Sequence, residues 1–201
     1  MNHPTKSPSQ DLPQRLAEAN AKVARNTRDP KAFLERAALY KRLEQYPESV
    51  ADYSHALELD RDNPQIIIDR AVVYRLMGEF QLALSDLTQV TANHPDMWQG
   101  HYHRGLCYSE MGHPERAVAD FGKCIKLAPE KPHGYFGRGE AFFKLKQYDA
   151  VVLDMDKVIA LAPKVTAGYQ LRARALAAGG QFEKAFADSQ MIVSLKPDDP
   201  L

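Results

Sequence analysis

Three histidines and one cysteine near the middle of the chain are the residues whose types could bind a metal. His103 and Cys107 are four residues apart and would share one face of a helix, and His133 follows later in the chain. Imidazole and thiolate groups are ligands for Zn²⁺. His101, however, lies two residues before His103 and points to nearly the opposite helix face, so the ligand set is incomplete. We therefore predict no metal site and expect Cys107 and Cys124 to be small core residues.

A second candidate for chemistry is the glycine-rich run GYFGRG at residues 134–139. Glycine-rich loops cradle phosphates where they join a strand to a helix, but no strand is expected before this run. The sequence also has no nucleophile elbow, no HExxH motif and no pair of carboxylates in a defined pocket. We therefore predict a protein with no catalytic site and no cofactor.

Composition narrows the class of protein further. The 201 residues include 26 Lys and Arg and 26 Asp and Glu, so the formal net charge is zero, and a basic surface for nucleic acid is not expected. No run of about 18 apolar residues could span a membrane, and residues 1–11 lack the apolar core of a signal peptide. Two cysteines are too few for a disulfide scaffold. These features predict a soluble, cytoplasmic protein without membrane insertion.

The elements that would position these side chains appear as an internal repeat of 34 residues. The recurring arginines are Arg36, Arg70, Arg104, Arg138 and Arg172. The recurring aspartates are Asp52, Asp86, Asp120, Asp154 and Asp188. With the first repeat starting at Pro30, the repeats are 30–63, 64–97, 98–131, 132–165 and 166–199, without insertion or deletion.

Each repeat has the pattern of two helices joined by short turns. We number positions from the first residue of each repeat. Position 8 is always small: Ala37, Ala71, Gly105, Gly139 and Ala173. Position 11 is always large: Tyr40, Tyr74, Tyr108, Phe142 and Leu176. Positions 4, 8 and 11 have helical spacing, and so do positions 17, 20, 24 and 28. Glycine at position 15 and proline at position 32 end helices in most repeats. Each repeat is therefore predicted to contain helix A, a tight turn and helix B.

This pattern resembles the tetratricopeptide repeat family over residues 30–199. The shared positions are the small and large residues at 8 and 11, glycine at 15, an aromatic at 17, a small residue at 20 and proline at 32. The resemblance implies an all-α, right-handed α-solenoid of five 34-residue helix hairpins. We expect residues 12–29 to cap the first hairpin, with a helix over 12–27, and residues 1–11 to form a disordered tail. Repeat 1 departs from the pattern with Glu44 at position 15 and Arg61 at position 32.

The arginines and aspartates have a structural interpretation and a functional one. Positions 7 and 23 are equally far from the turn at position 15, so they lie at similar heights in an antiparallel helix pair. We expect the ten residues to form ion pairs within a repeat or between neighbours, which would fix helix packing. The alternative is that five regularly spaced cations bind an extended acidic partner.

The resemblance also implies a concave groove lined by the A helices. We expect this groove to bind a peptide or helical segment of a partner protein through apolar anchors. The expected groove residues are Leu34, Ile68, Val72, Gln99, Tyr102, His103, Leu106, Phe136, Glu140, Phe143 and Arg174. The groove would be apolar across repeats 2 to 4 and polar in repeat 5. The alternative is that some of these residues only pack between neighbouring A helices.

Two further features bear on the groove. Gly137 either leaves room beside Phe136 for a partner side chain or is a tolerated substitution.

Some members of the family bind the C-terminal carboxylate of chaperones with a cluster of basic and Asn residues. Asp69 occupies one of the corresponding positions and would repel a carboxylate, so we do not expect that activity.

The last B helix is expected to leave Phe186, Met191 and Ile192 partly uncovered. Three interpretations of this face remain open. It binds a partner or a second copy of the chain, it marks a shortened chain, or polar Ser189 and the following tail cover it sufficiently.

The sequence as a whole predicts a non-catalytic adaptor or scaffold that binds another protein. The alternatives are a dedicated chaperone that shields a client protein and a targeting subunit of a larger enzyme assembly.

Overall fold

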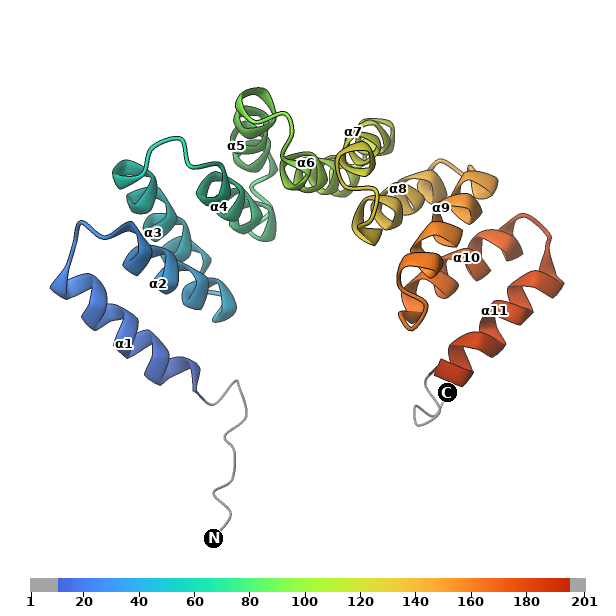
Figure 1. The fold of residues 1–201 in the computed structure, drawn as a ribbon, viewed down its shortest axis with the longest axis horizontal. Coiled ribbons are helices and arrows are strands. Elements are labelled where there is room, and N and C mark those ends of the chain that lie inside the picture. The colour runs from blue at the N-terminus through green and yellow to red at the C-terminus, as the bar shows by residue number, and fades with distance from the viewer. Residues whose placement is uncertain (1–10, 196–201) are drawn as a thin grey trace, which may run out of the picture. The chain divides into compact units, whose positions relative to one another are not determined.

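The computed structural model describes residues 11–195, and these residues form eleven α-helices and no strand (Figure 1). The helices are α1 Leu12–Arg25, α2 Pro30–Arg42, α3 Tyr46–Leu59, α4 Pro64–Leu76, α5 Phe80–Asn93, α6 Trp98–Glu110, α7 Pro114–Leu127, α8 Pro132–Lys144, α9 Tyr148–Leu161, α10 Thr166–Ala178 and α11 Phe182–Leu195. The prediction of an all-α fold with five helix hairpins behind a leading helix is confirmed. Most of the expected tail at 1–11 and the end of repeat 5 at 196–199 lie outside the described residues.

The leading helix is shorter than expected. It ends at Arg25 rather than at residue 27, because Asn26 has an extended backbone (φ −145°, ψ 94°). Its buried residues Leu12, Ala19 and Val23 lie on one face. That face packs on the first hairpin, where Leu12 and Ala19 contact Leu39, and Val23 joins the core around Phe33.

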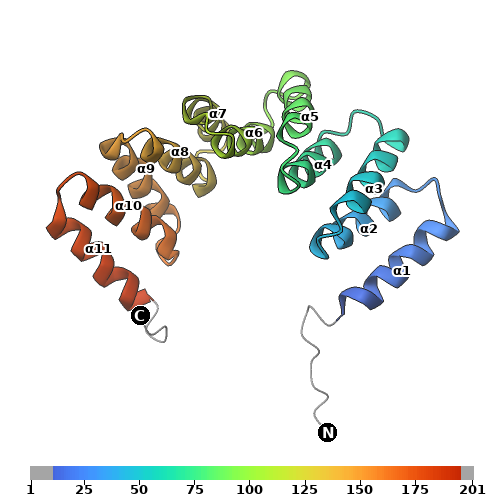
Figure 2. The same ribbon diagram turned by 180° about the vertical axis from the view of Figure 1, so that it is seen from behind.

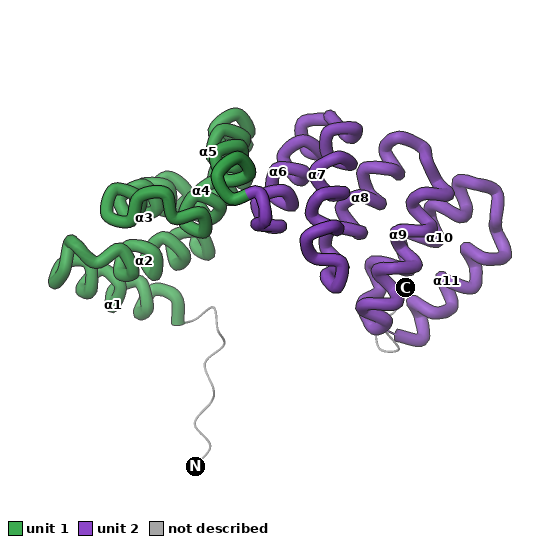
Figure 3. The backbone as a smooth tube through the Cα atoms, turned by 45° about the horizontal axis from the view of Figure 1, so that its top comes forward, with its two compact units in different colours: residues 1–94 green, residues 95–201 purple. Residues whose placement is uncertain are grey.

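The chain divides into two compact units (Figure 3). Unit 1 covers residues 1–94 and holds α1 to α5, and unit 2 covers residues 95–201 and holds α6 to α11. In each unit, helices that follow one another in the chain pack together. In unit 2, α8 also packs directly on α6 and on α10, whereas no comparable contact joins α7, α9 and α11 (Figure 2). The A helices of unit 2 therefore form its inner layer and the B helices its outer layer.

The five hairpin turns are closed in the same way. The backbone N–H at position 16 donates to the carbonyl oxygen at position 11, over 2.8–3.0 Å, in every repeat. Position 15 is left-handed throughout, with φ of 77–79° at Gly78, Gly112 and Gly180. Glu44 and Lys146 adopt the same conformation, with φ of 58° and 59°, although a side chain makes it less favourable by about 1–2 kcal/mol. The turn therefore persists where the sequence departs from glycine.

Candidate protein-binding site

The arginines and aspartates of the repeat pair with each other inside their own hairpins. In all five repeats, arginine Nε donates to Oδ2 of the aspartate over 2.7–2.9 Å, and Nη2 donates to Oδ1 over 2.6–2.8 Å. The aspartate side chains are only 5–9% exposed. Since each guanidinium is already occupied by a buried carboxylate, these cations are not available to an acidic partner.

The third nitrogen of several of these arginines reaches the preceding B helix. Nη1 of Arg70 donates to Ser54 over 3.1 Å, and Nη1 of Arg172 donates to Asp156 over 2.5 Å. Arg36 bonds Asn20 of α1 in the same way, over 3.2 Å. Ser54 and Asp156 occupy position 25 of their repeats, and Asn20 occupies the corresponding place on α1, so each bond joins a hairpin to the helix before it.

His101 belongs to this internal network. It is 3% exposed, and its Nδ1 lies 3.4 Å from Oδ1 of Asp120 and its Nε2 lies 3.2 Å from the carbonyl oxygen of Pro95. Burial alone would raise the pKa of Asp120, but its hydrogen bonds with Arg104 and His101 outweigh burial and lower that pKa below its ordinary value. Residues 11–195 contain no cluster of three His, Cys, Asp or Glu side chains that could hold a metal ion, and Cys107 and Cys124 are buried.

One expected groove residue of unit 1 lies in the core instead. Ile68 is only 1% exposed, so its assignment to a binding surface is wrong. α4 buries three successive residues, Ile66, Ile67 and Ile68, which span about 200° of the helix circumference, so its buried face is wide enough to include Ile68. Leu34 and Val72 are half-buried, and Leu34 packs against the core of the first hairpin.

In unit 2 the inner helices carry a cluster of aromatic rings. Trp98 and Tyr102 of α6 lie with their ring centroids 6.2 Å apart. His133 of α8 lies 6.2 Å from Trp98 and 5.9 Å from Tyr102. The centroid of the Tyr102 ring also lies 5.9 Å from that of the buried Phe121 ring. The His103 ring packs edge-on against the Tyr102 ring, with a centroid distance of 5.2 Å. The cluster therefore joins the inner surface of α6 and α8 to the core beneath it.

The gap at Gly137 is already filled by the protein itself. A Cβ atom at Gly137 would lie 2.6 Å from Cε1 of Phe121, and a Cβ at Gly105 would lie 2.9 Å from the same atom. The Phe121 ring is thus wedged between the backbones of α6 and α8. The proposal that a partner side chain enters beside Gly137 is wrong, because Phe121 of α7 takes that space.

An apolar pocket opens next to the aromatic cluster. It has a volume of about 290 Å³ and is lined by Tyr102, Pro132, His133, Phe136, Val158, Ala162, Val165 and Ala167. These residues come from α6, α8, the end of α9, the following loop and the start of α10. Its volume lies at the lower end of the range of about 300–1,000 Å³ that is usual for ligand sites, and it has room for a large apolar side chain.

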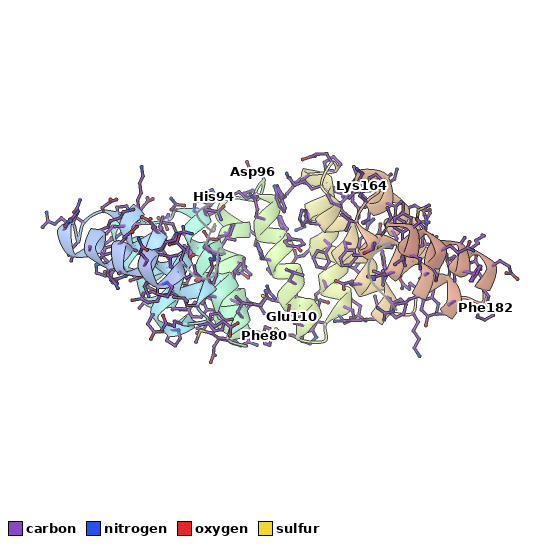
Figure 4. The ribbon with its side chains drawn as sticks, turned by 90° about the horizontal axis from the view of Figure 1, so that it is seen from below. Phe80, His94, Asp96, Glu110, Lys164 and Phe182 are labelled. Carbon is purple, nitrogen blue, oxygen red and sulfur yellow. The ribbon has the colours of Figure 1, made fainter. Side chains whose placement is uncertain are left out.

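The pocket lies toward the edge of unit 2 where the inner helices begin. Asp96 and Lys164, which precede α6 and α10, lie along one edge in Figure 4, and Glu110 at the end of α6 lies on the opposite edge. Lys131, just before α8, places its Nζ 5.3 Å from the centroid of the Trp98 ring. Val165, adjacent to Lys164, is 52% exposed. The pocket is therefore open to solvent beside two lysines.

Polar groups dominate further along the same helices. The guanidinium carbon of Arg174 on α10 lies 4.7 Å from the centroid of the Phe143 ring on α8. Lys144 donates to the carbonyl oxygen and hydroxyl of Ser109 over 2.7 and 3.0 Å. Partial desolvation raises the pKa of Glu140 above its ordinary value, although Lys144 and Arg174 act in the opposite direction.

The expected groove residues of unit 2 thus lie on the inner helices with different exposures. Glu140 and Arg174 are exposed, whereas the other six are half-buried: Gln99, Tyr102, His103, Leu106, Phe136 and Phe143. Sequence reasoning did not place Trp98, His133 or Val165 at the binding surface, and it considered His133 only as a metal ligand. Position 1 of repeat 3 holds the only tryptophan of the chain, and that was the available signal for Trp98.

Comparisons with known proteins agree on the repeat. Sequence profiles of the tetratricopeptide repeat match residues 30–63 and 98–131, which are the boundaries expected for repeats 1 and 3. A comparison with curated proteins found no match. No helix in the part of the chain described by the structure has the length and apolar character needed to cross a bilayer.

Several solved structures share the fold at low sequence identity. A tetratricopeptide repeat protein from Parabacteroides merdae ATCC 43184 is 22% identical, with a TM-score of 0.77 over 96% of this chain and 75% of that one. MamA from Desulfovibrio magneticus RS-1 is 14% identical, with a TM-score of 0.75 over 86% and 97% of the two chains. YrrB, described as a TPR protein with an unusual peptide-binding site, is 17% identical, with a TM-score of 0.67 over 90% and 93%. With its repeat length, hairpins and profile matches in agreement, the chain belongs to the tetratricopeptide repeat family.

Proposed function

We propose that the inner surface of α6, α8 and α10 binds a segment of a partner protein and that the chain acts as a non-catalytic adaptor. The observation that carries this proposal is the open apolar pocket between Tyr102, His133, Phe136 and Val165, on the helices that form the inner layer of unit 2. Repeat proteins use such inner surfaces for binding, and buried apolar anchors supply most of the binding energy at protein interfaces.

Exposed apolar side chains on α11 support a second contact surface. Phe182 and Phe186 are 65% and 64% exposed, and Val193 is 53% exposed. At position 24, α11 has exposed Ser189 where the other four repeats bury a large residue. A surface of this kind favours association with another protein or with a second copy of the chain. Two separate surfaces are what an adaptor needs in order to hold two partners together.

The inner surface can be tested with a photo-crosslinking amino acid at single positions of the full chain. Gln170 lies on α10 between Ala167 and Arg174, so it shares their face, and it is exposed. Leu153 on the outer helix α9 is 69% exposed and is the matched control. We expect position 170, but not position 153, to crosslink a protein from native lysate. Crosslinking at position 153 alone, or equally at both positions, would contradict the proposed site.

A further inference from the structure

The inner surface of unit 2 offers two attachment points of different chemistry. The first is the apolar pocket, which is lined by four helices and the loop before α10 and has room for a large side chain. The second is the guanidinium of Arg174, seven residues after the pocket residue Ala167 on the same helix α10. Seven residues of α-helix span about 10 Å, so one short segment can reach both points.

Arg174 differs from the repeated arginines in having no internal acceptor. The five arginines at position 7 each bond a buried aspartate twice, whereas Arg174 has no hydrogen bond or ion pair among residues 11–195. It is exposed, and the ring of Phe143 supports its guanidinium at 4.7 Å. Stacking orients the planar group while its N–H donors stay available, and that geometry favours a carboxylate.

Two cations, Arg174 and Lys144, act on the carboxylate of Glu140. Glu140 on α8 is the neighbouring carboxylate, and it interacts electrostatically with both Arg174 and Lys144. Lys144 lies one helical turn after Glu140, and its ammonium group is held on Ser109. The cluster of Glu140, Lys144 and Arg174 therefore sums to +1, which is complementary to an acidic side chain and unfavourable for a basic one.

We propose that the bound segment is acidic: it places a large apolar side chain in the pocket and an Asp or Glu side chain on Arg174, about 10 Å away. In a helical segment these two residues are about seven positions apart, and in an extended segment about three. This inference rests on the proposed function, because it assumes that the inner surface of unit 2 is the binding site. It adds the chemistry and the spacing of the residues that are recognised.

The test selects random linear peptides displayed on phage against the full chain and then synthesises the enriched sequences. We expect the enriched peptides to share a large apolar residue and an Asp or Glu at one of the two spacings. The Arg174→Gln variant should weaken their binding by about tenfold or more, because hydrogen bonds to a charged group are lost. Arg116→Gln is the matched control, since Arg116 also stacks on a ring, that of Tyr108 at 5.6 Å, and its helix α7 belongs to the outer layer.

The apolar point has its own matched pair of variants. Val165 lines the pocket and is also the N-cap residue of α10, with no side-chain capping bond. Asp and Thr both serve as N-caps, so neither Val165→Asp nor Val165→Thr should unfold the helix. We expect Val165→Asp to weaken peptide binding by about tenfold or more, because it places a charge in the pocket, and Val165→Thr to change it little.

The outcomes separate this inference from the proposed function. Peptides that depend on Val165 but not on Arg174, or enriched peptides without an acidic residue, would overturn the inference and leave the inner surface as the site. Selected peptides that bind both charge-altered variants as well as wild type would overturn both. Failure to enrich any peptide would overturn two-point recognition of a linear segment, and the crosslinking at position 170 would then decide the proposed function by itself.

Discussion

Replacing Gly137 with alanine tests how closely α6 and α8 approach each other around Phe121. The added Cβ would lie 2.6 Å from Cε1 and 2.7 Å from Cζ of the Phe121 ring. Carbon atoms in contact are normally about 3.5–4.0 Å apart, so the ring or the helices must shift by about 1 Å. The ring is fully buried, and a Cβ at Gly105 would meet the same ring edge at 2.9 Å, so there is little room for it to move away.

Two opposing effects set the magnitude for Gly137→Ala. Alanine is favoured over glycine inside a helix by about 1 kcal/mol. Overpacking a well-filled core costs about 1–3 kcal/mol. Because the ring is confined by both helices, we expect the cost to lie in the upper part of that range. The free energy of unfolding of Gly137→Ala should therefore fall by about 1–2 kcal/mol.

Urea titration followed by the fluorescence of Trp98 gives the stability of unit 2, because Trp98 is the only tryptophan and lies in the inner aromatic cluster. Gly122→Ala on α7 is the matched control, since a Cβ there has no atom within 4 Å, and it should raise the free energy of unfolding by about 1 kcal/mol. In the Phe121→Leu background the loss caused by Gly137→Ala should shrink or reverse. A Gly137→Ala variant more stable than wild type would refute the close approach.

Three further predictions concern the framework around the site. Gly122→Ser should raise the free energy of unfolding by about 1 kcal/mol in urea titration. Gly122 occupies position 25, so a serine hydroxyl there can accept a hydrogen bond from Arg138, as Ser54 does from Arg70. An unchanged free energy of unfolding would contradict this prediction. The pKa of Asp120 is lowered in the fold, so its contribution to stability is complete above the unfolded pKa of about 3.9 and is lost as pH falls through the lower folded value. Acid titrations of stability should therefore be shallower for Asp120→Asn, and parallel curves would argue against this pairing. Burial raises the pKa of Cys124 to about 11, so the thiol should resist alkylation at neutral pH until denaturant opens unit 2, and rapid labelling of the folded chain would count against its burial.

The framework could be predicted from the sequence because each repeated position has one physical task. Arginine at position 7 and aspartate at position 23 are always 16 residues apart, and a closed hairpin brings that spacing into contact, as it does for Arg36 and Asp52. The small residue at position 8 and the left-handed residue at position 15 follow from helix packing and turn geometry in the same way. Such local rules need no knowledge of distant neighbours.

The site itself depends on contacts that the repeat pattern does not encode. The pocket needs residues from α6, α8, α9 and α10 at once, and its rim residue Val165 lies in a connection rather than at a groove position. The role of Gly137 depends on Phe121 from another helix. Ile68 occupies the same repeat position as Tyr102 and Phe136, yet it is buried, because the surroundings of a position differ between repeats.

The central claim is that a partner segment covers the inner surface of unit 2. Hydroxyl-radical footprinting of the full chain, with and without the protein captured by crosslinking at position 170, measures this directly. We predict that Tyr102, Phe136 and Phe143 lose reactivity on binding, while Leu153 on the outer helix α9 keeps it. Loss of reactivity at Leu153, with no change at the three inner aromatic residues, would contradict the account.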